Sequence, residues 1–520
     1  MSKTAKAAAW IMMATMLSKI LGFFREQIFA NFYGTGIYAD VFVLTLNIPA
    51  LIMPIIGSAV ATTYIPMYVE TKEKKGEEEA LKFTNNVLNV CYILAIVISL
   101  LGLIYTEQFV KVFAAGFVSN PEKFKTAVIF TKIMISGALF ITGSKIIGSY
   151  LQVNDSFTAP SLIGLPYNVI LISAIIISGL TKNIYILPVG ALLAMASQLF
   201  FQIPFAKKKS YKYQTYLNFS DESIKKLGIL VMPMLLGVSV GQINTYIDKL
   251  LASLLLDGRL SALNYANKLN EFVLALFVTS IITVIYPKLS KLSNSDDKSG
   301  FINTIVRSSN VVVLVVLPIS VGFIIFAEPI VRILFERGMF NAESTQLTTI
   351  ALQLFSLGLL ACGVRDVLYR VFYSLSDTKT PMINSSISLI INIVLNLILI
   401  KPLGHAGLAL STSISSILTA ILLFFSLRKK KGHFGGMRIV KTGLKSALGT
   451  AVMAVVAWFT YSKLFGFLGA GLINEILSVG TAALLGAGIY LFIITLMKVE
   501  EVDLVFDLLK KGKNKLLKRS

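Results

Sequence analysis

The hydrophobic pattern of this chain consists of long apolar runs separated by short polar connections. The runs recur from about residue 8 to residue 498, and most reach the ~20 residues with which an α-helix crosses a bilayer core. They lack the strict alternation of apolar and polar residues that transmembrane β-strands require, so helices are predicted. We count fourteen runs, near residues 8–33, 41–68, 83–106, 127–151, 157–179, 184–205, 224–256, 262–287, 301–327, 347–374, 382–400, 404–426, 439–463 and 473–497.

Composition supports a membrane protein, with 55% hydrophobic residues, 14% charged residues and a mean hydropathy of +0.76. The net charge of +21 could indicate a nucleic-acid partner, but Lys and Arg gather in alternate connections. By the positive-inside rule, these connections and both termini are predicted to be cytoplasmic, and no nucleic acid is expected. The basic connections carry Lys72, Lys74, Lys75, Lys207–Lys209, Lys212, Lys288, Lys291 and Arg428–Lys431.

Motifs for catalysis or for a bound cofactor are missing from the sequence. No G-x-x-x-x-G-K-[ST] motif occurs, and the connections are too short for a soluble domain of ~50 residues or more. Cys91 and Cys362 both fall inside apolar runs, and His405 and His433 have no second ligand at metal spacing. The sequence therefore predicts neither an enzyme nor a cofactor-binding protein.

The chain contains a weak internal repeat. The Tyr64–Tyr68 stretch returns as Ile285–Leu289, and Glu26 and Gly36 align with Asp248 and Gly258. An even number of helices separates the copies, so the repeat is parallel, as in transporters whose substrate site lies between two halves. The predicted parts are an N-lobe (1–206), a cytoplasmic linker (207–223), a C-lobe (224–427), two extra helices (428–498) and a basic amphipathic tail (499–520).

Several charges lie inside the apolar runs, where each costs at least ~2.5 kcal/mol unless it faces water or a partner. From the helical rise, Arg25 and Lys268 lie ~10–13 Å below the external surface and Lys19 ~20 Å below it. These cations predict a wet cavity for a multiply charged anion such as a diphosphate. The carboxylates of Glu26, Asp40 and Glu271 suit that cavity, but they equally suit ion pairs that only support packing.

A second polar set predicts a cation site. Asn392 and Asn396 are four residues apart and share one helix face, and Thr412 lies on the next predicted helix. Asp248, Asn392 and Thr412 each come out ~12 Å deep. One carboxylate with amide and hydroxyl oxygens could hold Na⁺ as a coupling ion. Polar contacts between helices remain the alternative.

Four stretches of the sequence, together with Asp40, resemble the MurJ lipid II flippases of the MOP exporter superfamily. They are Ser18–Glu26 (SKILGFFRE), Tyr33–Gly36, Asp40, Tyr265–Phe272 (YANKLNEF) and Gly404–Ala409 (GHAGLA). The resemblance covers essentially the whole chain and includes the count of fourteen spans.

This resemblance implies an all-α membrane protein with two pseudo-symmetric six-helix lobes and two extra helices that line a lipid-tail groove. It implies that undecaprenyl-diphosphate-linked peptidoglycan precursor, lipid II, moves from the inner to the outer leaflet of the bacterial cytoplasmic membrane by alternating access. A cation gradient or the membrane potential would drive the cycle. The implied partners are this substrate, the bilayer and the cell-wall synthesis machinery, and the protein is expected to be a monomer.

The resemblance also implies site residues. The family's cavity arginines fall on Lys19, Arg25 and Lys268, and its sodium site resembles the set Asp248, Asn392, Asn396 and Thr412. Because Lys lacks the bidentate fork of Arg, two of the three diphosphate contacts would be point-like.

One departure from the family keeps other functions open. Met53 and Ser58 stand where the family typically carries an Arg and a Glu in the second helix. A flippase for another polyprenyl-linked glycan would tolerate this change. A drug or organic-cation antiporter of the same superfamily is a weaker alternative, because its cavity should hold surplus carboxylates rather than these deep cations.

Overall fold

The computed structural model describes residues 3–501, and these residues form helices and connections without a β-strand. The chain divides into two compact units, the first with residues 1–264 and 337–344 and the second with residues 265–336 and 345–520. This all-helical architecture confirms the predicted fold class. The lobe boundaries predicted from the sequence remain a prediction, and the tail beyond residue 501 lies outside the described residues.

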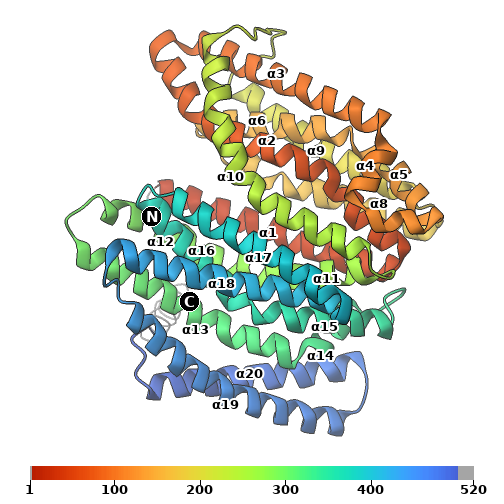
Figure 1. Cartoon of the computed structure of the whole chain (residues 1–520), viewed down its shortest axis with the longest axis vertical. Coiled ribbons are helices and arrows are strands. Elements are labelled where there is room, and N and C mark those ends of the chain that lie inside the picture. Colours follow the sequence, from red (N-terminus) through yellow and green to blue (C-terminus); the bar gives the residue numbers. More distant parts are fainter. Residues whose placement is uncertain (1–2, 502–520) are drawn as a thin grey trace, which may run out of the picture. The chain divides into compact units, whose positions relative to one another are not determined.

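The first unit holds the helices up to the beginning of α11 (Figure 1). Their bounds are α1 Lys3–Tyr33, α2 Ile37–Lys75, α3 Glu77–Ile104, α4 Thr106–Phe113, α5 Pro121–Met134, α6 Gly137–Val153, α7 Thr158–Leu162, α8 Gly164–Thr181, α9 Ile186–Lys208, α10 Glu222–Ser253 and α11 Arg259–Val273, with a 3₁₀ turn at Ala115–Ser119.

The second unit begins within α11 and holds the remaining helices. Their bounds are a π-helical turn at Leu274–Val278, α12 Thr279–Ser293, α13 Lys298–Ile325, α14 Ala327–Phe335, α15 Ala342–Leu357, α16 Leu359–Ser374, α17 Lys379–Leu403, α18 His405–Lys431, α19 Gly436–Leu468 and α20 Leu472–Leu496. Figure 1 shows α19 and α20 side by side. Tyr490 of α20 attaches this pair to α13, because its hydroxyl donates to the Leu314 carbonyl at 2.8 Å.

Nine stretches of the described residues are long and apolar enough to cross a membrane. Two further candidates are bent helix pairs, α5 with α6 (41°) and α15 with α16 (44°), which would raise the number to eleven. The chain is therefore a multi-pass membrane protein, and the count of fourteen spans remains a prediction.

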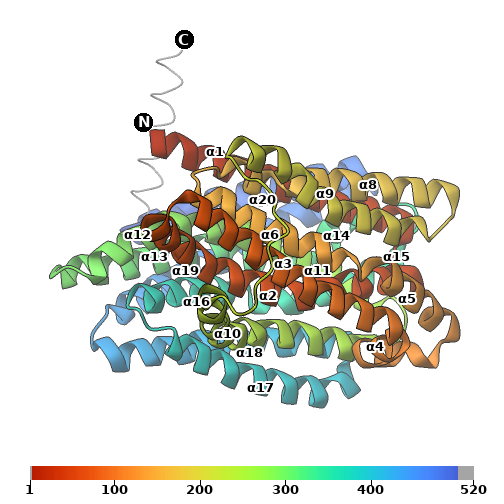
Figure 2. The same ribbon diagram turned by 90° about the horizontal axis from the view of Figure 1, so that it is seen from above.

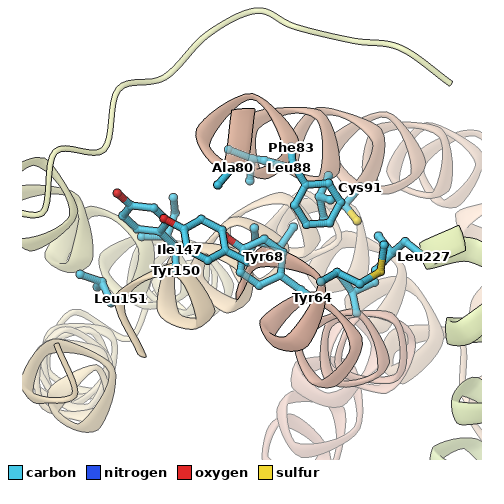
Figure 3. Packing of buried hydrophobic residues seen from close by; sticks show 14 of the residues in the cluster. Tyr64, Tyr68, Ala80, Phe83, Leu88, Cys91, Ile147, Tyr150, Leu151 and Leu227 are labelled. Carbon is cyan, nitrogen blue, oxygen red and sulfur yellow. The ribbon is translucent and has the colours of Figure 1, made fainter. Parts of the chain in front are cut away.

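The interior of the first unit contains an aromatic cluster between α2, α3, α6, α9 and α10. Tyr64, Tyr68 and Tyr150 are each 1% exposed or less. Figure 3 shows the three rings with Phe83 of α3 and Leu227 of α10 around them. Tyr64 stacks on Phe83 at 5.7 Å between ring centroids. This cluster includes the Tyr64–Tyr68 stretch that the sequence singled out as one copy of the repeat.

Close backbone approaches order the turns at the opposite end of the first unit. Gly34, between α1 and α2, has a φ of +53°, and a Cβ there would lie 2.3 Å from the Met339 carbonyl oxygen. The Met339 amide in turn donates to the Asn31 carbonyl at 2.8 Å. Glycine is required at this turn because a side chain would fit neither the left-handed backbone nor the available space.

Candidate functional site

Arg25 lies on α1 and is held by three neighbours within the first unit. Its Nη2 donates to Glu26 Oε1 at 2.5 Å, and its Nη1 donates to Asn168 Oδ1 at 3.0 Å. Its guanidinium also lies over the ring of Tyr167 at 5.8 Å. The side chain is 16% exposed. The guanidinium thus has a fixed orientation, and further N–H donors remain for an anionic ligand.

The fixed orientation of Arg25 depends on close packing of α1 against α8. Asn168 of α8 also donates to the Ser18 carbonyl at 3.2 Å, so one amide side chain contacts α1 at two points. Gly164 allows this approach, because a Cβ there would lie 1.8 Å from Ser18 Oγ. The Ser18–Glu26 stretch is therefore placed by α8, a helix to which the sequence assigned no site residue.

Asp40 takes part in a buried charge cluster near the start of α2. Its Oδ2 accepts from Lys123 Nζ at 2.9 Å, and Lys123 Nζ also donates to Asp257 Oδ1 at 2.7 Å. The Lys123 side chain is 3% exposed and its ammonium lies 4.4 Å from the centroid of the Phe117 ring. Two carboxylates and an aromatic face compensate this buried cation.

The Asp40 carboxylate also binds the amino end of α11. It accepts from the amides of Gly258 and Ser261 at 2.9 and 2.8 Å, an arrangement that suits the positive end of a helix dipole. Asp40 therefore connects α2, α5 and α11 inside the first unit. These contacts occupy both carboxylate oxygens. A part of Asp40 in substrate binding remains a prediction.

Lys268 lies farther along α11, in the residues that belong to the second unit. Its Nζ donates to Glu271 Oε2 at 2.7 Å, and Glu271 Oε1 accepts from Asn267 at 2.8 Å. The side chains of Lys268 and Glu271 are 34% and 52% exposed. This pair is accessible to a ligand, and the Lys268 ammonium has a second and third N–H with which to bind it.

Lys19, Met53 and Ser58 complete the positions singled out in the first two helices. Lys19 is exposed on α1. Met53 and Ser58 lie in α2, and their side chains are outside the part that the structure describes. Whether Lys19, Arg25 and Lys268 bind one ligand together remains a prediction, since Lys268 belongs to the other unit.

The residues of the predicted sodium site divide between the units. Asp248 belongs to the first unit, and Asn392, Asn396 and Thr412 belong to the second. Asn392 and Asn396 are both buried, and Asn396 Nδ2 donates to Asn392 Oδ1 at 3.0 Å. Thr412 Oγ1 donates to the Leu408 carbonyl at 2.9 Å. The two amides meet on one face of α17 as predicted, and the sodium site itself remains a prediction.

Two groups of charged residues carried no prediction from the sequence. Lys123 lies between the third and fourth predicted spans, where a lysine gives no signal of burial. Arg365 and Asp366 lie inside the tenth predicted span and should have been found by the search for charges in apolar runs. They form an ion pair at 3.2 Å, and Arg370 lies 5.6 Å from the Tyr286 ring centroid.

Comparison with known proteins identifies the family. A family model described as "Lipid II flippase MurJ" matches residues 29–477. A "Probable lipid II flippase MurJ" of Rickettsia prowazekii (strain Madrid E) is 28% identical over 495 residues, which cover 94% of this chain and 97% of that protein. Its counterpart in Vibrio cholerae serotype O1 (strain ATCC 39315 / El Tor Inaba N16961) is 29% identical over 500 residues, which cover 94% and 95%.

Solved structures agree with this assignment. The structure titled "Lipid II flippase MurJ, inward closed conformation" has a TM-score of 0.81 and 26% identity, and the match covers 94% of this chain and 98% of that one. An inward-facing MATE multidrug transporter of the MOP superfamily has a TM-score of 0.64 at 15% identity, covering 82% and 95%, and so shares the fold alone. Because the family model spans residues 29–477 of the 520-residue chain, this protein belongs to the family of MurJ lipid II flippases.

Proposed function

We propose that this protein flips lipid II, the undecaprenyl-diphosphate-linked peptidoglycan precursor, from the inner to the outer leaflet. The observation that carries the proposal is the Arg25 site, in which a guanidinium on α1 is held by Glu26, Asn168 and Tyr167. An oriented guanidinium with N–H donors to spare is suited to a diphosphate. Relatives that align over 94% of the chain, at 28% and 26% identity, are described as lipid II flippases.

In this proposal the diphosphate is bound by Lys19, Arg25 and Lys268, and Glu26 and Glu271 orient two of these cations. The site would open to each side of the membrane in turn. Lys19 and Lys268 would contact phosphate oxygens as point charges, whereas Arg25 can form paired hydrogen bonds. A substrate with two charged phosphates is held during the cycle without a covalent step, so the protein would act as a transporter and not as an enzyme.

The proposal includes a membrane orientation and a set of partners. The protein would lie in the bacterial cytoplasmic membrane with both termini in the cytoplasm, because Lys and Arg occupy alternate connections. It would act as a monomer and meet the cell-wall synthesis machinery through its substrate. A single Cys at Ser210, in a protein without Cys91 and Cys362, tests the orientation. Labelling by an impermeant reagent from outside the cell would refute it.

Rescue of a bacterium depleted of its own lipid II flippase tests the substrate. We expect growth with the wild-type chain and no growth with Arg25→Ala at equal membrane abundance. Vesicles that contain purified protein and labelled lipid II provide the second measurement. Failure of rescue together with absence of flipping in vesicles would refute the proposal.

A flippase for another polyprenyl-linked glycan is the second candidate. It is favoured by Met53 and Ser58, which replace an Arg and a Glu in the resemblance drawn from the sequence. The same vesicles distinguish the two functions when lipid II is exchanged for a polyprenyl-diphosphate with a different glycan. Faster flipping of the second lipid would favour this candidate.

We further propose that Na⁺ binds Asp248, Asn392, Asn396 and Thr412 and biases the conformational cycle. A cation can drive the cycle only through different affinities for the two states, and a hundredfold difference corresponds to about 2.7 kcal/mol. Asp248 supplies the formal charge of the set, so Asp248→Asn should abolish any stabilisation by Na⁺ over K⁺. An identical response of wild type and variant would refute this site.

A further inference from the structure

A groove of about 570 Å³ lies on the first unit, and Arg25 is not among the residues that line it. Helices α3, α6 and α9 line it together with part of the connection between α9 and α10. This connection runs without helix from residue 209 to 221, and its course can be followed in Figure 2. We call residues 211–218 of this connection the strap. The residues that line the groove are Asn89, Tyr92, Ile93 and Ile96 of α3, Leu139 and Phe140 of α6, Leu199 of α9, and Tyr213, Thr215 and Leu217 of the strap.

Hydrogen bonds to α3 fix the strap. Asn85 donates to the Lys212 carbonyl at 3.0 Å, and Asn86 and Asn218 exchange two bonds of 3.0 and 2.9 Å. Asn89 donates to the carbonyls of residues 214 and 216 at 3.1 and 2.9 Å. These asparagines replace the hydrogen bonds that the strap backbone would otherwise make within a helix. The strap is therefore an ordered wall of the groove.

The groove changes in character along its length. Asn89 and the hydroxyl of Tyr213, which are 3.0 Å apart, form its polar end. Ile93 and Ile96 follow along α3, and Ile96 lies ~10 Å beyond Asn89 by the helical rise. A site with a polar end and a long apolar floor on membrane-spanning helices fits an amphiphile that points its chain into the bilayer core.

Four lysines lie at the end of α9 and at the beginning of the strap, next in sequence to the residues that line the groove. Lys207, Lys208, Lys209 and Lys212 are all exposed, and none of them forms an ion pair within residues 3–501. Lys212 directly precedes Tyr213, and the Lys209 carbonyl accepts from the Tyr150 hydroxyl at 2.7 Å. No Asp or Glu occurs between residues 156 and 220.

The nearest carboxylates on α3 are already occupied. Glu78 and Glu79 pair with Lys82 at 3.5 and 2.9 Å, and Glu77 pairs with Lys72 at 3.6 Å. These glutamates therefore do not neutralise the lysines at the strap. A basic segment that leads into the wall of an apolar groove is complementary to an anionic lipid head group and its chain.

We propose that the strap groove binds an anionic phospholipid, with an acyl chain along Ile93, Ile96 and Leu139 and the phosphate against Lys209 and Lys212. The placement of this lipid in the cytoplasmic leaflet rests on the orientation given under the proposed function. Binding itself does not depend on flipping, so the two proposals can fail separately.

The test measures lipid binding to the purified full chain by native mass spectrometry, with phosphatidylglycerol and phosphatidylcholine as probes. We expect wild type to retain phosphatidylglycerol at least about tenfold more tightly, since each lysine near a lipid surface contributes about fivefold. Changing the four lysines to Gln should remove the preference, and changing them to Arg should keep it. Equal retention of the two lipids by wild type would overturn the proposal.

A groove-filling variant locates the site. Ile96 is 43% exposed, and Ile96→Trp should reduce phosphatidylglycerol retention at least about tenfold. Val189 is 44% exposed and lines a second groove between α8 and α9, so Val189→Trp is the matched control and should leave retention unchanged. Leu139→Trp repeats the test from α6 if Ile96→Trp folds poorly.

The same binding measurements distinguish a phospholipid in the groove from the polyprenyl chain of the substrate. If undecaprenyl phosphate displaces phosphatidylglycerol, and Ile96→Trp reduces the binding of undecaprenyl phosphate but not that of phosphatidylglycerol, the groove binds the substrate chain and the proposal is wrong. If both Trp variants of the strap groove bind phosphatidylglycerol as wild type does, the lipid lies elsewhere and the proposal is equally wrong. If flipping fails in vesicles while these binding results hold, the proposed function fails and the lipid site stands.

Discussion

Arg25 on α1 and Lys268 on α11 were assigned the same role, yet their surroundings differ. The Arg25 side chain is 16% exposed and is held by Glu26, Asn168 and Tyr167. Lys268 is 34% exposed and is held by Glu271 one turn away on its own helix. Arg25 is therefore fixed before a ligand arrives, whereas Lys268 can adjust to it. In the proposed site, Arg25 would therefore be a rigid contact and Lys268 an adaptable one.

Arg25→Ala should have the largest effect. It removes charge-assisted hydrogen bonds to the substrate and leaves the mostly buried Glu26 without its partner, so flipping should fall about a hundredfold and the free energy of unfolding should fall by about 3 kcal/mol. Vesicle flipping and thermal unfolding check the two effects. Phe24→Ala, at an exposed neighbour on the same helix, is the control. Wild-type flipping by Arg25→Ala would remove Arg25 from the site.

Lys123→Met tests whether the buried Lys123–Asp40 pair stabilises the fold. It leaves the Asp40 carboxylate buried without its cation, so the free energy of unfolding should fall by about 3 kcal/mol. Thermal unfolding with and without Asp40→Asn measures the coupling, and the double variant should be less destabilised than the sum of the single ones. Lys125→Met, at an exposed lysine of α5, is the control. Additive effects would mean that the cluster does not act as a unit.

Lys268→Ala should reduce flipping by about tenfold, because one charge-assisted contact of about 1.5 kcal/mol or slightly more is lost. It should leave stability unchanged, since the Lys268–Glu271 pair is exposed and such pairs contribute little. Lys268→Arg should retain flipping. Flipping in vesicles and thermal unfolding measure the two effects. If Lys268→Ala destabilised the protein as much as Arg25→Ala, the proposed difference between a rigid Arg25 and an adaptable Lys268 would be wrong.

Asp377 is a buried carboxylate of the second unit, outside the predicted spans, and it pairs with the exposed Lys430. Burial alone would raise the pKa of this carboxyl, but hydrogen bonds from Lys430 and Thr380 outweigh that effect and lower the pKa to about 2. Because the folded pKa is lower than the unfolded value, the stabilisation is present above pH ~4 and is lost as the pH falls toward 2. Asp377→Asn should cost about 1–2 kcal/mol at pH 5.

Unfolding by denaturant at pH 5 and at pH 2.5 measures this last effect. The difference between wild type and Asp377→Asn should shrink at the lower pH. If wild type and Asp377→Asn differ in free energy of unfolding by the same amount at both pH values, the charge of Asp377 does not stabilise the fold.

The sequence by itself determined the class of protein and several candidate residues. Apolar runs of span length leave helices as the available structure, because each backbone amide in a bilayer must be paired within its own segment. The same reasoning marked Arg25 and Lys268, since a charge in such a run is costly wherever it lies. The spacing of Asn392 and Asn396 placed them on one face of α17, where they form a hydrogen bond.

Only the tertiary structure decided which charge pairs with which. Asp40 was read as a cavity residue, but it pairs with Lys123 of α5, which lies 83 residues further along the chain. Asn168 and Tyr167 carried no signal in the sequence, because an amide and a phenol cost little in an apolar run and their value depends on the approach of α8 to α1. The strap shows the same limit, since a polar stretch between two helices says nothing of the helix face that binds it. Hydrophobic periodicity is local in sequence, whereas ion pairs and hydrogen bonds between helices depend on packing that brings distant residues together.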